Sequence, residues 1–134
     1  LHSDSAQLVA LAGVGSLGQA LIAHTGRDRR FTVGALFDDE PGLVGARLSP
    51  DGPVIAPLHA LGGTGDDGEP FDIGVIATRD ELAQEVCDAF ATAGVQQILN
   101  VTPVSLTPRD GVSIRQIDLA LELQLLSFAA AGKR

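Results

Sequence analysis

The fold is decided by the stretch Gln7-Leu8-Val9-Ala10-Leu11-Ala12-Gly13-Val14-Gly15-Ser16-Leu17-Gly18. Residues 7–12 form a short apolar run without alternation, which is typical of a strand buried on both faces of a parallel sheet. Residues 13–18 fit the pattern G-x-G-x-x-G, and residues 16–24 then carry apolar side chains at helical spacing. A strand, a glycine turn and a helix in this order predict the first βα unit of a dinucleotide-binding fold.

Each glycine of the turn has a predicted role. Gly13 makes the tight turn, Gly15 lets the backbone approach a pyrophosphate, and Gly18 lets the helix pack closely on the strand. The start of the helix also offers unpaired N–H groups and a positive dipole end, which suit an anion. The candidate ligand-binding residues in this turn are therefore Gly13, Val14, Gly15, Ser16, Leu17 and Gly18.

A second candidate group lies at the end of the next predicted strand, residues 31–37. Asp38 follows Gly18 by 20 residues, the place where a carboxylate accepts hydrogen bonds from the adenosine ribose. Asp39 and Glu40 come next with no arginine beside them, so a 2′-phosphate would be repelled and NAD is favoured over NADP. The alternative is a Rossmann-type fold with a structural glycine turn and an acidic surface loop.

Further apolar runs alternate along the chain with helical patterns. We expect strands at 71–77, 95–101 and 112–115, helices at 80–93 and 116–131, and loops over 42–70 with a short strand near 54–55 and a helical turn at 57–61. Glycine-rich residues 62–69 are expected to form a surface loop. This order predicts one α/β domain over residues 1–134: a Rossmann-like, doubly wound, mostly parallel sheet with helices on both faces.

The doubly wound order also predicts which other loops approach a ligand. Ligands of such sheets cross the point where the connections reverse, outside the carboxyl ends of the strands. The loops after the predicted strands 71–77 and 95–101 then supply Thr78, Arg79, Asn100, Thr102 and Pro103. For Thr78 and its neighbour Asp80, capping of the following helix is the alternative role.

Composition limits the class of protein. The chain has 134 residues, 45% of them hydrophobic, one cysteine and a formal net charge of −8. One cysteine excludes an internal disulfide framework and a zinc cluster, which favours a reducing, cytoplasmic setting. No apolar run is long enough to cross a membrane. The charge argues against nucleic-acid binding by this chain alone, and the absence of methionine suggests a fragment.

Residues suited to catalysis are scarce. Tyrosine is absent and the one lysine is Lys133. His24 and His59 are expected at a helix end and in a loop, and Cys87 is expected to pack in the core. No nucleophile and base can be paired and no metal site can be assembled, so we expect a binding protein that is not an enzyme.

The closing helix is apolar around nearly its whole circumference. Asp118, Glu122 and Ser127 leave only a narrow polar line along it. A helix apolar on all sides must be buried on more than one side, which predicts a two-fold dimer through residues 117–131. The expected interface residues are Ile117, Asp118, Leu119, Leu121, Leu123, Leu125, Leu126 and Phe128. The alternative is a terminal helix packed into its own core.

Together these pieces resemble the NAD(H)-binding domain of the redox-sensing transcriptional repressor family Rex. The blocks that carry the resemblance extend over nearly the whole chain, and their order is more specific than the glycine motif. They are residues 9–21, 37–41, 44–45, 73–78, 93–100, 103–104 and 114–128.

The resemblance implies a homodimer in which a winged-helix domain, absent from this chain, binds operator DNA and is released when NADH binds. It implies that helix 117–131 is exchanged between subunits, that Val44 lies in the cofactor site, and that Asp118 pairs with an arginine of the DNA-binding domain. It also places Leu119 near the partner's nicotinamide. Arg79 stands where the family has a proline, and Val101-Thr102 stands where Phe-Ala is usual.

Three alternative functions agree with these patterns and with the resemblance. The first is an NAD(H) sensor in which the charge or polarity near residues 78–80 separates the cationic nicotinamide of NAD⁺ from the neutral ring of NADH. The second is the cofactor-binding half of an NAD-dependent dehydrogenase, and the third is a coenzyme A binding module.

Overall fold

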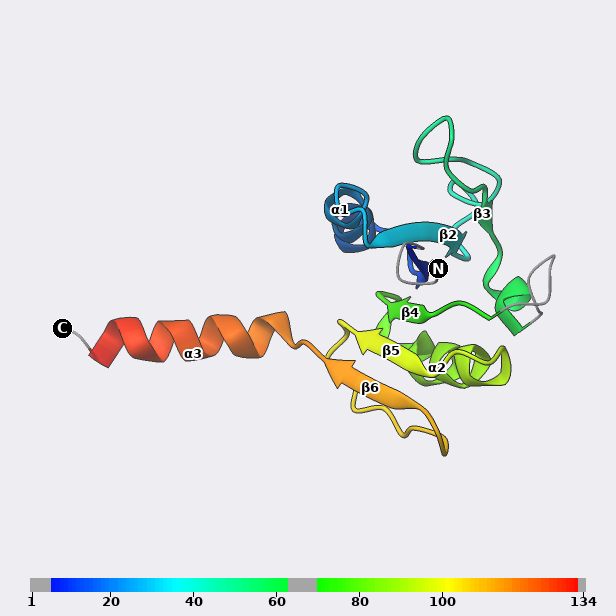
Figure 1. Cartoon of the computed structure of the whole chain (residues 1–134). Coiled ribbons are helices and arrows are strands. Elements are labelled where there is room, and N and C mark those ends of the chain that lie inside the picture. Colours follow the sequence, from blue (N-terminus) through cyan, green and yellow to red (C-terminus); the bar gives the residue numbers. More distant parts are fainter. Residues whose placement is uncertain (1–5, 63–69, 133–134) are drawn as a thin grey trace.

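The computed structural model describes residues 6–62 and 70–132, which form one six-stranded sheet flanked by helices (Figure 1). The strand order is β3-β2-β1-β4-β5-β6, and every pairing between neighbouring strands is parallel. The predicted Rossmann-like, doubly wound sheet is therefore confirmed. The elements are β1 Gln7–Ala12, α1 Ser16–Thr25, β2 Phe31–Phe37, β3 Ile55–Ala56, β4 Ile73–Ile76, α2 Ala83–Thr92, β5 Gln97–Asn100, β6 Ser113–Gln116 and α3 Leu119–Gly132, with 3₁₀ turns at Leu58–Gly62 and Asp80–Leu82.

The central strand β1 contributes to two separate cores. Ala10 and Ala12 pack in the cluster that contains Phe90 of α2, whereas Val9 and Leu11 pack in the cluster on the α1 side. Because successive side chains of a strand point to opposite faces, one apolar run can bury both faces of the sheet. This alternation is why α1 and α2 cover opposite faces.

The connections of the sheet reverse between β1 and β4. From β1 the chain moves outward to β2 and β3, then returns to β4 on the other side of β1. The register aligns the carboxyl ends at this point, because Ala12 pairs with both Phe37 of β2 and Ile76 of β4. The loops that follow these three strands therefore meet at one edge of the sheet.

Several element boundaries differ from those predicted. The helix expected over 80–93 is a 3₁₀ turn followed by α2, and the strand expected over 71–77 spans only residues 73–76. The closing helix begins at Leu119 instead of residue 116, because Gln116 still pairs with Asn100 in the sheet. Its start is set by Asp118, whose Oδ1 accepts a hydrogen bond from the Leu121 N–H at 3.0 Å, as a helix-capping aspartate does. Of the glycine-rich stretch 62–69, residues 63–69 lie outside the described part of the chain.

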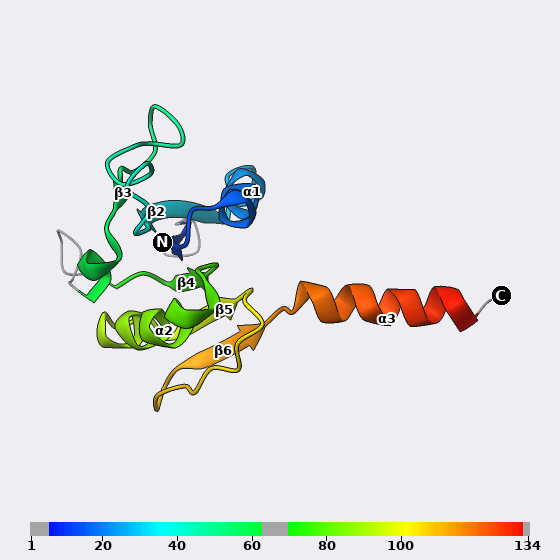
Figure 2. The same ribbon diagram turned by 180° about the vertical axis from the view of Figure 1, so that it is seen from behind.

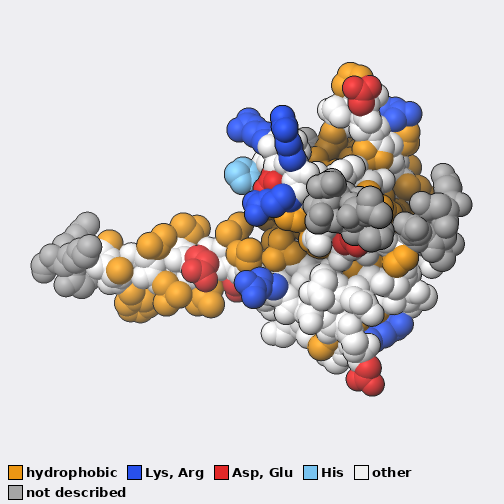
Figure 3. All heavy atoms as spheres, viewed as in Figure 1, with side chains coloured by type: hydrophobic (Ala, Val, Ile, Leu, Met, Phe, Trp, Pro, Cys, Tyr) orange, Lys and Arg blue, Asp and Glu red, His pale blue; other side chains and the backbone are white. Residues whose placement is uncertain are grey.

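Helix α3 extends away from the rest of the domain (Figures 1 and 2). The residues from Leu119 to Ala130 are exposed, and Phe128 has a relative solvent-accessible area of 78%. Apolar side chains accordingly line the projecting helix in Figure 3. The alternative in which this helix packs into its own core is wrong.

Within residues 6–62 and 70–132, no helix combines the length and apolar character needed to span a bilayer. In the same part of the chain, no three His, Cys, Asp or Glu side chains are arranged so that they could hold a metal ion.

Candidate functional site

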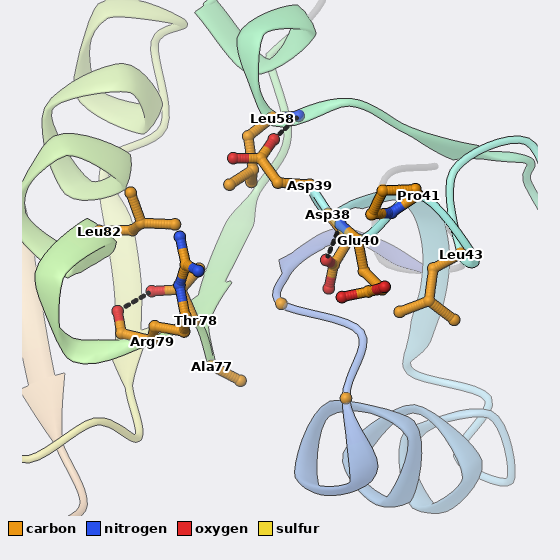
Figure 4. Close-up of a pocket in the computed structure, with 12 residues that line it drawn as sticks. Asp38, Asp39, Glu40, Pro41, Leu43, Leu58, Ala77, Thr78, Arg79 and Leu82 are labelled. Atoms are coloured by element: carbon orange, nitrogen blue, oxygen red, sulfur yellow. Dashed lines mark hydrogen bonds between the residues drawn. The ribbon is translucent and has the colours of Figure 1, made fainter.

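A crevice of about 410 Å³ opens at the carboxyl ends of β1, β2 and β4 (Figure 4). It lies at the reversal point of the sheet, where ligands of doubly wound folds bind, and its size is in the range of small-molecule sites. The residues that line it are Gly13, Gly15, Asp38, Asp39, Glu40, Pro41, Leu43, Leu58, Ala77, Thr78, Arg79 and Leu82.

The glycine turn has the geometry predicted from its spacing. Gly13 has a φ of +98°, and a Cβ there would lie 2.3 Å from the Ala77 carbonyl oxygen. A Cβ on Gly18 would lie 2.1 Å from the carbonyl oxygen of Gly13, so a side chain at either position would displace backbone. Gly15 differs, because a Cβ there would meet no atom within 4 Å. The absence of a side chain at Gly15 thus leaves space in the crevice without being needed for packing.

The first turn of α1 begins beside this space. Gly15 is the residue that flanks the helix start, and no side chain caps the helix there. The N–H groups at a helix start have no partner within the helix, and together with the helix dipole they favour an anion. Ser16 and Leu17 in this first turn are exposed next to the crevice.

Asp38 joins the glycine turn to the end of β2. Its Oδ2 accepts a hydrogen bond from the Val14 N–H at 2.6 Å, and its Oδ1 accepts one from the Glu40 N–H at 2.8 Å. A carboxylate has about four acceptor positions. Asp38 can therefore hold the turn and still accept hydroxyl hydrogens from a ligand. The bond to Val14 is a role that the sequence did not indicate.

The two walls of the crevice carry opposite charge. Asp38, Asp39 and Glu40 lie on the wall that follows β2, and Arg79 lies on the facing wall that follows β4 (Figure 4). The Asp39 carboxylate is held near Leu58, whose N–H lies 3.4 Å from its Oδ1. A ligand that spans the crevice thus meets hydrogen-bond acceptors at one end and a cation at the other.

The side chains of Thr78 and Asp80 do not cap the helical segments that follow β4. Thr78 Oγ1 donates to the carbonyl oxygen of Arg79 at 3.0 Å, and no side chain caps the 3₁₀ turn that begins at Asp80. The capping alternative for Thr78 and Asp80 is therefore wrong. Thr78 is half-buried and Arg79 is exposed, and both line the crevice.

Eight predicted site residues do not line the crevice. Four of them, Val14, Ser16, Leu17 and Gly18, belong to the glycine turn and the first turn of α1, and the other four, Val44, Asn100, Thr102 and Pro103, come from elsewhere in the chain. Asn100 and Thr102 are buried and bond to each other, with the Thr102 hydroxyl donating to Asn100 Oδ1 at 2.7 Å. Asn100 Nδ2 also donates to the Val104 carbonyl oxygen at 2.8 Å. Pro103 is exposed beside this network, and Val44 is exposed in the excursion between β2 and β3.

The sequence did not indicate the apolar part of the crevice. Pro41 and Leu43 follow the acidic cluster, Leu58 comes from the 3₁₀ turn after β3, and Leu82 comes from the one before α2. Apart from Pro41, which falls in the block 37–41, these residues belong to no motif, and they come from three separate segments of the chain. Only the fold brings them together.

The clear pKa shifts lie outside the crevice. Hydrogen bonds from Arg30 lower the pKa of Asp28 from 3.8 to about 2, and the same side-chain contact raises the pKa of Arg30. Burial raises the pKa of the Cys87 thiol, with a smaller contribution from the neighbouring Asp88. Cys87 is 1% exposed within the core, as predicted. Neither His24 nor His59 lines the crevice.

The parallel strand order, the glycine turn and the crevice at the reversal point define the class of Rossmann-like α/β domains. A family model described as "CoA binding domain" matches residues 4–104. The chain belongs to this CoA-binding domain family.

Curated relatives of the chain carry the name "Redox-sensing transcriptional repressor Rex", which confirms the resemblance noted in the sequence. The relative from Streptomyces avermitilis is 42% identical over 121 residues, which are 90% of this chain and 47% of that protein. The relative from Desulfitobacterium hafniense is 35% identical over 127 residues, which are 94% of this chain and 59% of that protein. The chain thus spans about half the length of the curated relatives it matches.

Solved structures share the fold. The crystal structure of RSP, a Rex-family repressor, superposes with a TM-score of 0.82 at 23% identity, covering 97% of this chain and 61% of RSP. Two further RSP structures match with a TM-score of 0.81: a complex with β-NADH at 23% identity, and a complex with β-NAD⁺ and operator DNA at 24% identity. They cover 96% of this chain and 61% and 58% of the respective RSP chains.

Proposed function

We propose that this domain binds NAD(H) in the crevice and is the sensor part of a redox-responsive transcriptional repressor. The open space at Gly15, next to the start of α1, is the observation that carries the proposal, because a Cβ there would meet no atom within 4 Å and the uncapped N–H groups beside it suit a pyrophosphate. The similarity to Rex repressors and the RSP complexes with β-NADH and β-NAD⁺ support the choice of ligand.

In this proposal the dinucleotide lies across the crevice. Its pyrophosphate rests against the N–H groups at the start of α1, and Asp38 accepts the hydroxyl hydrogens of the adenosine ribose. Asp39 and Glu40 on the same wall disfavour a phosphate on that ribose, so NAD(H) is preferred to NADP(H). The nicotinamide half then extends past β1 towards Thr78 and Arg79 on the β4 side.

We propose that α3 is the dimer interface and is exchanged between two copies of the chain. Its apolar side chains are exposed around the helix, and Leu123, Leu126 and Phe128 each retain about two thirds or more of their exposure, at 67%, 66% and 78%. Such a surface is normally buried against a partner. Redox sensing requires that NADH and NAD⁺ differ in affinity for two arrangements of the dimer, because only differential affinity moves such an equilibrium.

We further propose that operator DNA is bound by a domain outside these residues, and that NADH binding releases the DNA. A net charge of −8 opposes direct contact of this domain with phosphates. The domain is proposed to act in the cytoplasm and to bind its ligand without turnover. Among the described residues that line the crevice, the ionisable side chains are three carboxylates and Arg79, with no histidine to move a proton.

Coenzyme A is the second candidate ligand, because the family model that matches the chain is described as a CoA binding domain. Coenzyme A carries a phosphate on its adenosine ribose, where this chain places Asp38, Asp39 and Glu40. Repulsion between this phosphate and the acidic wall makes coenzyme A the weaker candidate.

Calorimetric titration with NADH, NAD⁺ and coenzyme A, together with the mass of the domain in solution, tests the proposal. We expect a dimer that binds NADH more tightly than NAD⁺ and does not bind coenzyme A. Tight binding of coenzyme A would show that coenzyme A, and not NAD(H), is the ligand of the crevice. Equal, millimolar binding of both dinucleotides by a monomer would contradict the sensor. Hydride transfer to a substrate would instead indicate a dehydrogenase.

A further inference from the structure

Arg79 is a charged side chain on a wall of the crevice with no ion-pair partner among the described residues. The ion pairs in that part of the chain join Arg30 to Asp28 and Arg109 to Asp88. Arg79 lies at the turn between β4 and the 3₁₀ turn Asp80–Leu82, and it lines the crevice opposite the acidic wall (Figure 4). Its charge is therefore available to a ligand.

The charged side chains around Arg79 determine the electrostatic potential on this side of the crevice. Asp80 and Glu81 follow Arg79 in sequence, but they are exposed and do not line the crevice. The carboxylates that line it, from Asp38 to Glu40, lie on the far wall (Figure 4). A group bound beside Thr78 thus has a guanidinium on its own wall and carboxylates across the crevice.

The dinucleotide orientation proposed above places the redox-active ring on the Arg79 side. Asp38 fixes the adenosine end beyond β2, and the start of α1 fixes the pyrophosphate over β1. The remaining half of the ligand must continue across the reversal point towards β4. This step rests on the proposed function.

We propose that Arg79 is a specificity-determining residue that makes the site prefer the reduced cofactor. The nicotinamide ring of NAD⁺ carries a positive charge, whereas the ring of NADH is neutral. A guanidinium on the same wall repels the oxidised ring and leaves the reduced ring unaffected. Arg79 thereby opposes the acidic wall, whose carboxylates attract the cationic ring.

The effect is a moderate one. At an effective dielectric constant of about 20, two like unit charges about 10 Å apart repel each other enough to change a dissociation constant. Salt weakens this repulsion at an exposed side chain. We expect the preference for NADH over NAD⁺ to change roughly three- to tenfold when the charge is removed.

Titration of three ligands against matched variants tests this assignment. The ligands are NADH, NAD⁺ and ADP-ribose, which lacks the ring. The variants are Arg79→Gln, Arg79→Lys and the control Arg29→Gln, which removes an exposed arginine outside the crevice. We expect Arg79→Gln to tighten NAD⁺ and leave NADH and ADP-ribose unchanged. Arg79→Lys and Arg29→Gln should keep the original ratio.

Three outcomes would overturn the assignment. If Arg79→Gln weakens all three ligands equally, Arg79 contacts the pyrophosphate instead of sensing the ring. If the ratio of NADH to NAD⁺ affinity is unchanged in Arg79→Gln, the charge has no part in discrimination. If the unsubstituted domain binds none of the ligands, the proposed function fails first and the assignment fails with it.

Discussion

The Val14 N–H and the Asp38 carboxylate lie 2.6 Å apart, between the donor nitrogen and Oδ2, and join the glycine turn to the end of β2. The two residues are 24 positions apart in sequence. Hydrogen bonds to charged groups are among the stronger ones in proteins. One carboxylate therefore holds the glycine turn and is also part of the acidic wall of the crevice.

Asp38→Ala should weaken every ligand that contains adenosine by about 1–3 kcal/mol, because the ribose loses its acceptor and the turn loses its anchor. Calorimetry with NADH and ADP-ribose measures the effect. Asp110→Ala, which removes an exposed carboxylate outside the crevice, is the control. An unchanged dissociation constant would remove Asp38 from the site.

Two glycine substitutions should separate binding from folding. Gly15→Ala adds a methyl group to open space at a φ of −80°, so stability should hold while NADH binding is lost or strongly weakened. Gly18→Ala forces its Cβ against the Gly13 carbonyl and should lower the free energy of unfolding by about 1–3 kcal/mol. Urea denaturation and NADH titration of both variants give the comparison. Normal NADH binding by Gly15→Ala would contradict the proposed path of the pyrophosphate.

Asn100→Ala should lower the free energy of unfolding by about 1–3 kcal/mol, because it leaves buried polar groups without partners. Asn100 Oδ1 accepts from both the N–H and the hydroxyl of Thr102, and its Nδ2 donates to Val104. The measurement is a urea denaturation curve. Gln97→Ala, at the exposed start of β5, is the control. Equal stability of the two variants would show that the network contributes nothing.

Charged substitutions on α3 should convert the proposed dimer into a monomer. Leu123→Glu and Phe128→Glu place carboxylates at its two most exposed large apolar side chains, which are 67% and 78% exposed. Sedimentation equilibrium reports the mass. Glu122→Gln, on the same helix, removes a charge without changing the apolar surface and should leave the mass unaltered. If the unsubstituted domain and both charged variants sediment as dimers, the interface lies elsewhere.

Cys87 should be nearly unreactive towards thiol reagents at pH 8 in the folded domain. Burial excludes the reagent and raises the pKa of the thiol, so little of the nucleophilic thiolate is present. The rate of reaction with a disulfide reagent, measured with and without denaturant, checks this. Equal rates under the two conditions would show that the thiol is accessible in the folded state.

The sequence predicted best the parts of the fold that are set by local patterns. Residues 7–12 and the glycine turn are fixed by an apolar run and by the close approaches of Gly13 and Gly18, and both occur as predicted. The predicted start of α3 was wrong, because Gln116 pairs with Asn100 and so extends the sheet into the segment predicted as helix. A pairing between residues 16 positions apart leaves no local signal.

The candidate site was predicted in part. Gly13 and Gly15 of the glycine turn, together with Asp38 and Thr78, line one crevice, because parallel strands bring their carboxyl ends to the same edge. Asn100 and Thr102 also follow a strand, but their side chains satisfy each other in the interior. Position after a strand predicts which edge a residue occupies, whereas the direction of its side chain depends on the partners within reach.

The origin of α3 lies next to the loop that follows β5. Gln116 Nε2 donates to the Thr102 carbonyl oxygen at 3.3 Å, and the Ile117 N–H donates to the Asn100 carbonyl oxygen at 2.9 Å. With 14 residues and a rise of about 1.5 Å per residue, the helix is about 21 Å long, so a tilt of about 10° at its origin moves its far end by roughly 4 Å. A small rotation of α3 about this pair of hydrogen bonds would therefore displace the far end of the helix several times more than its start.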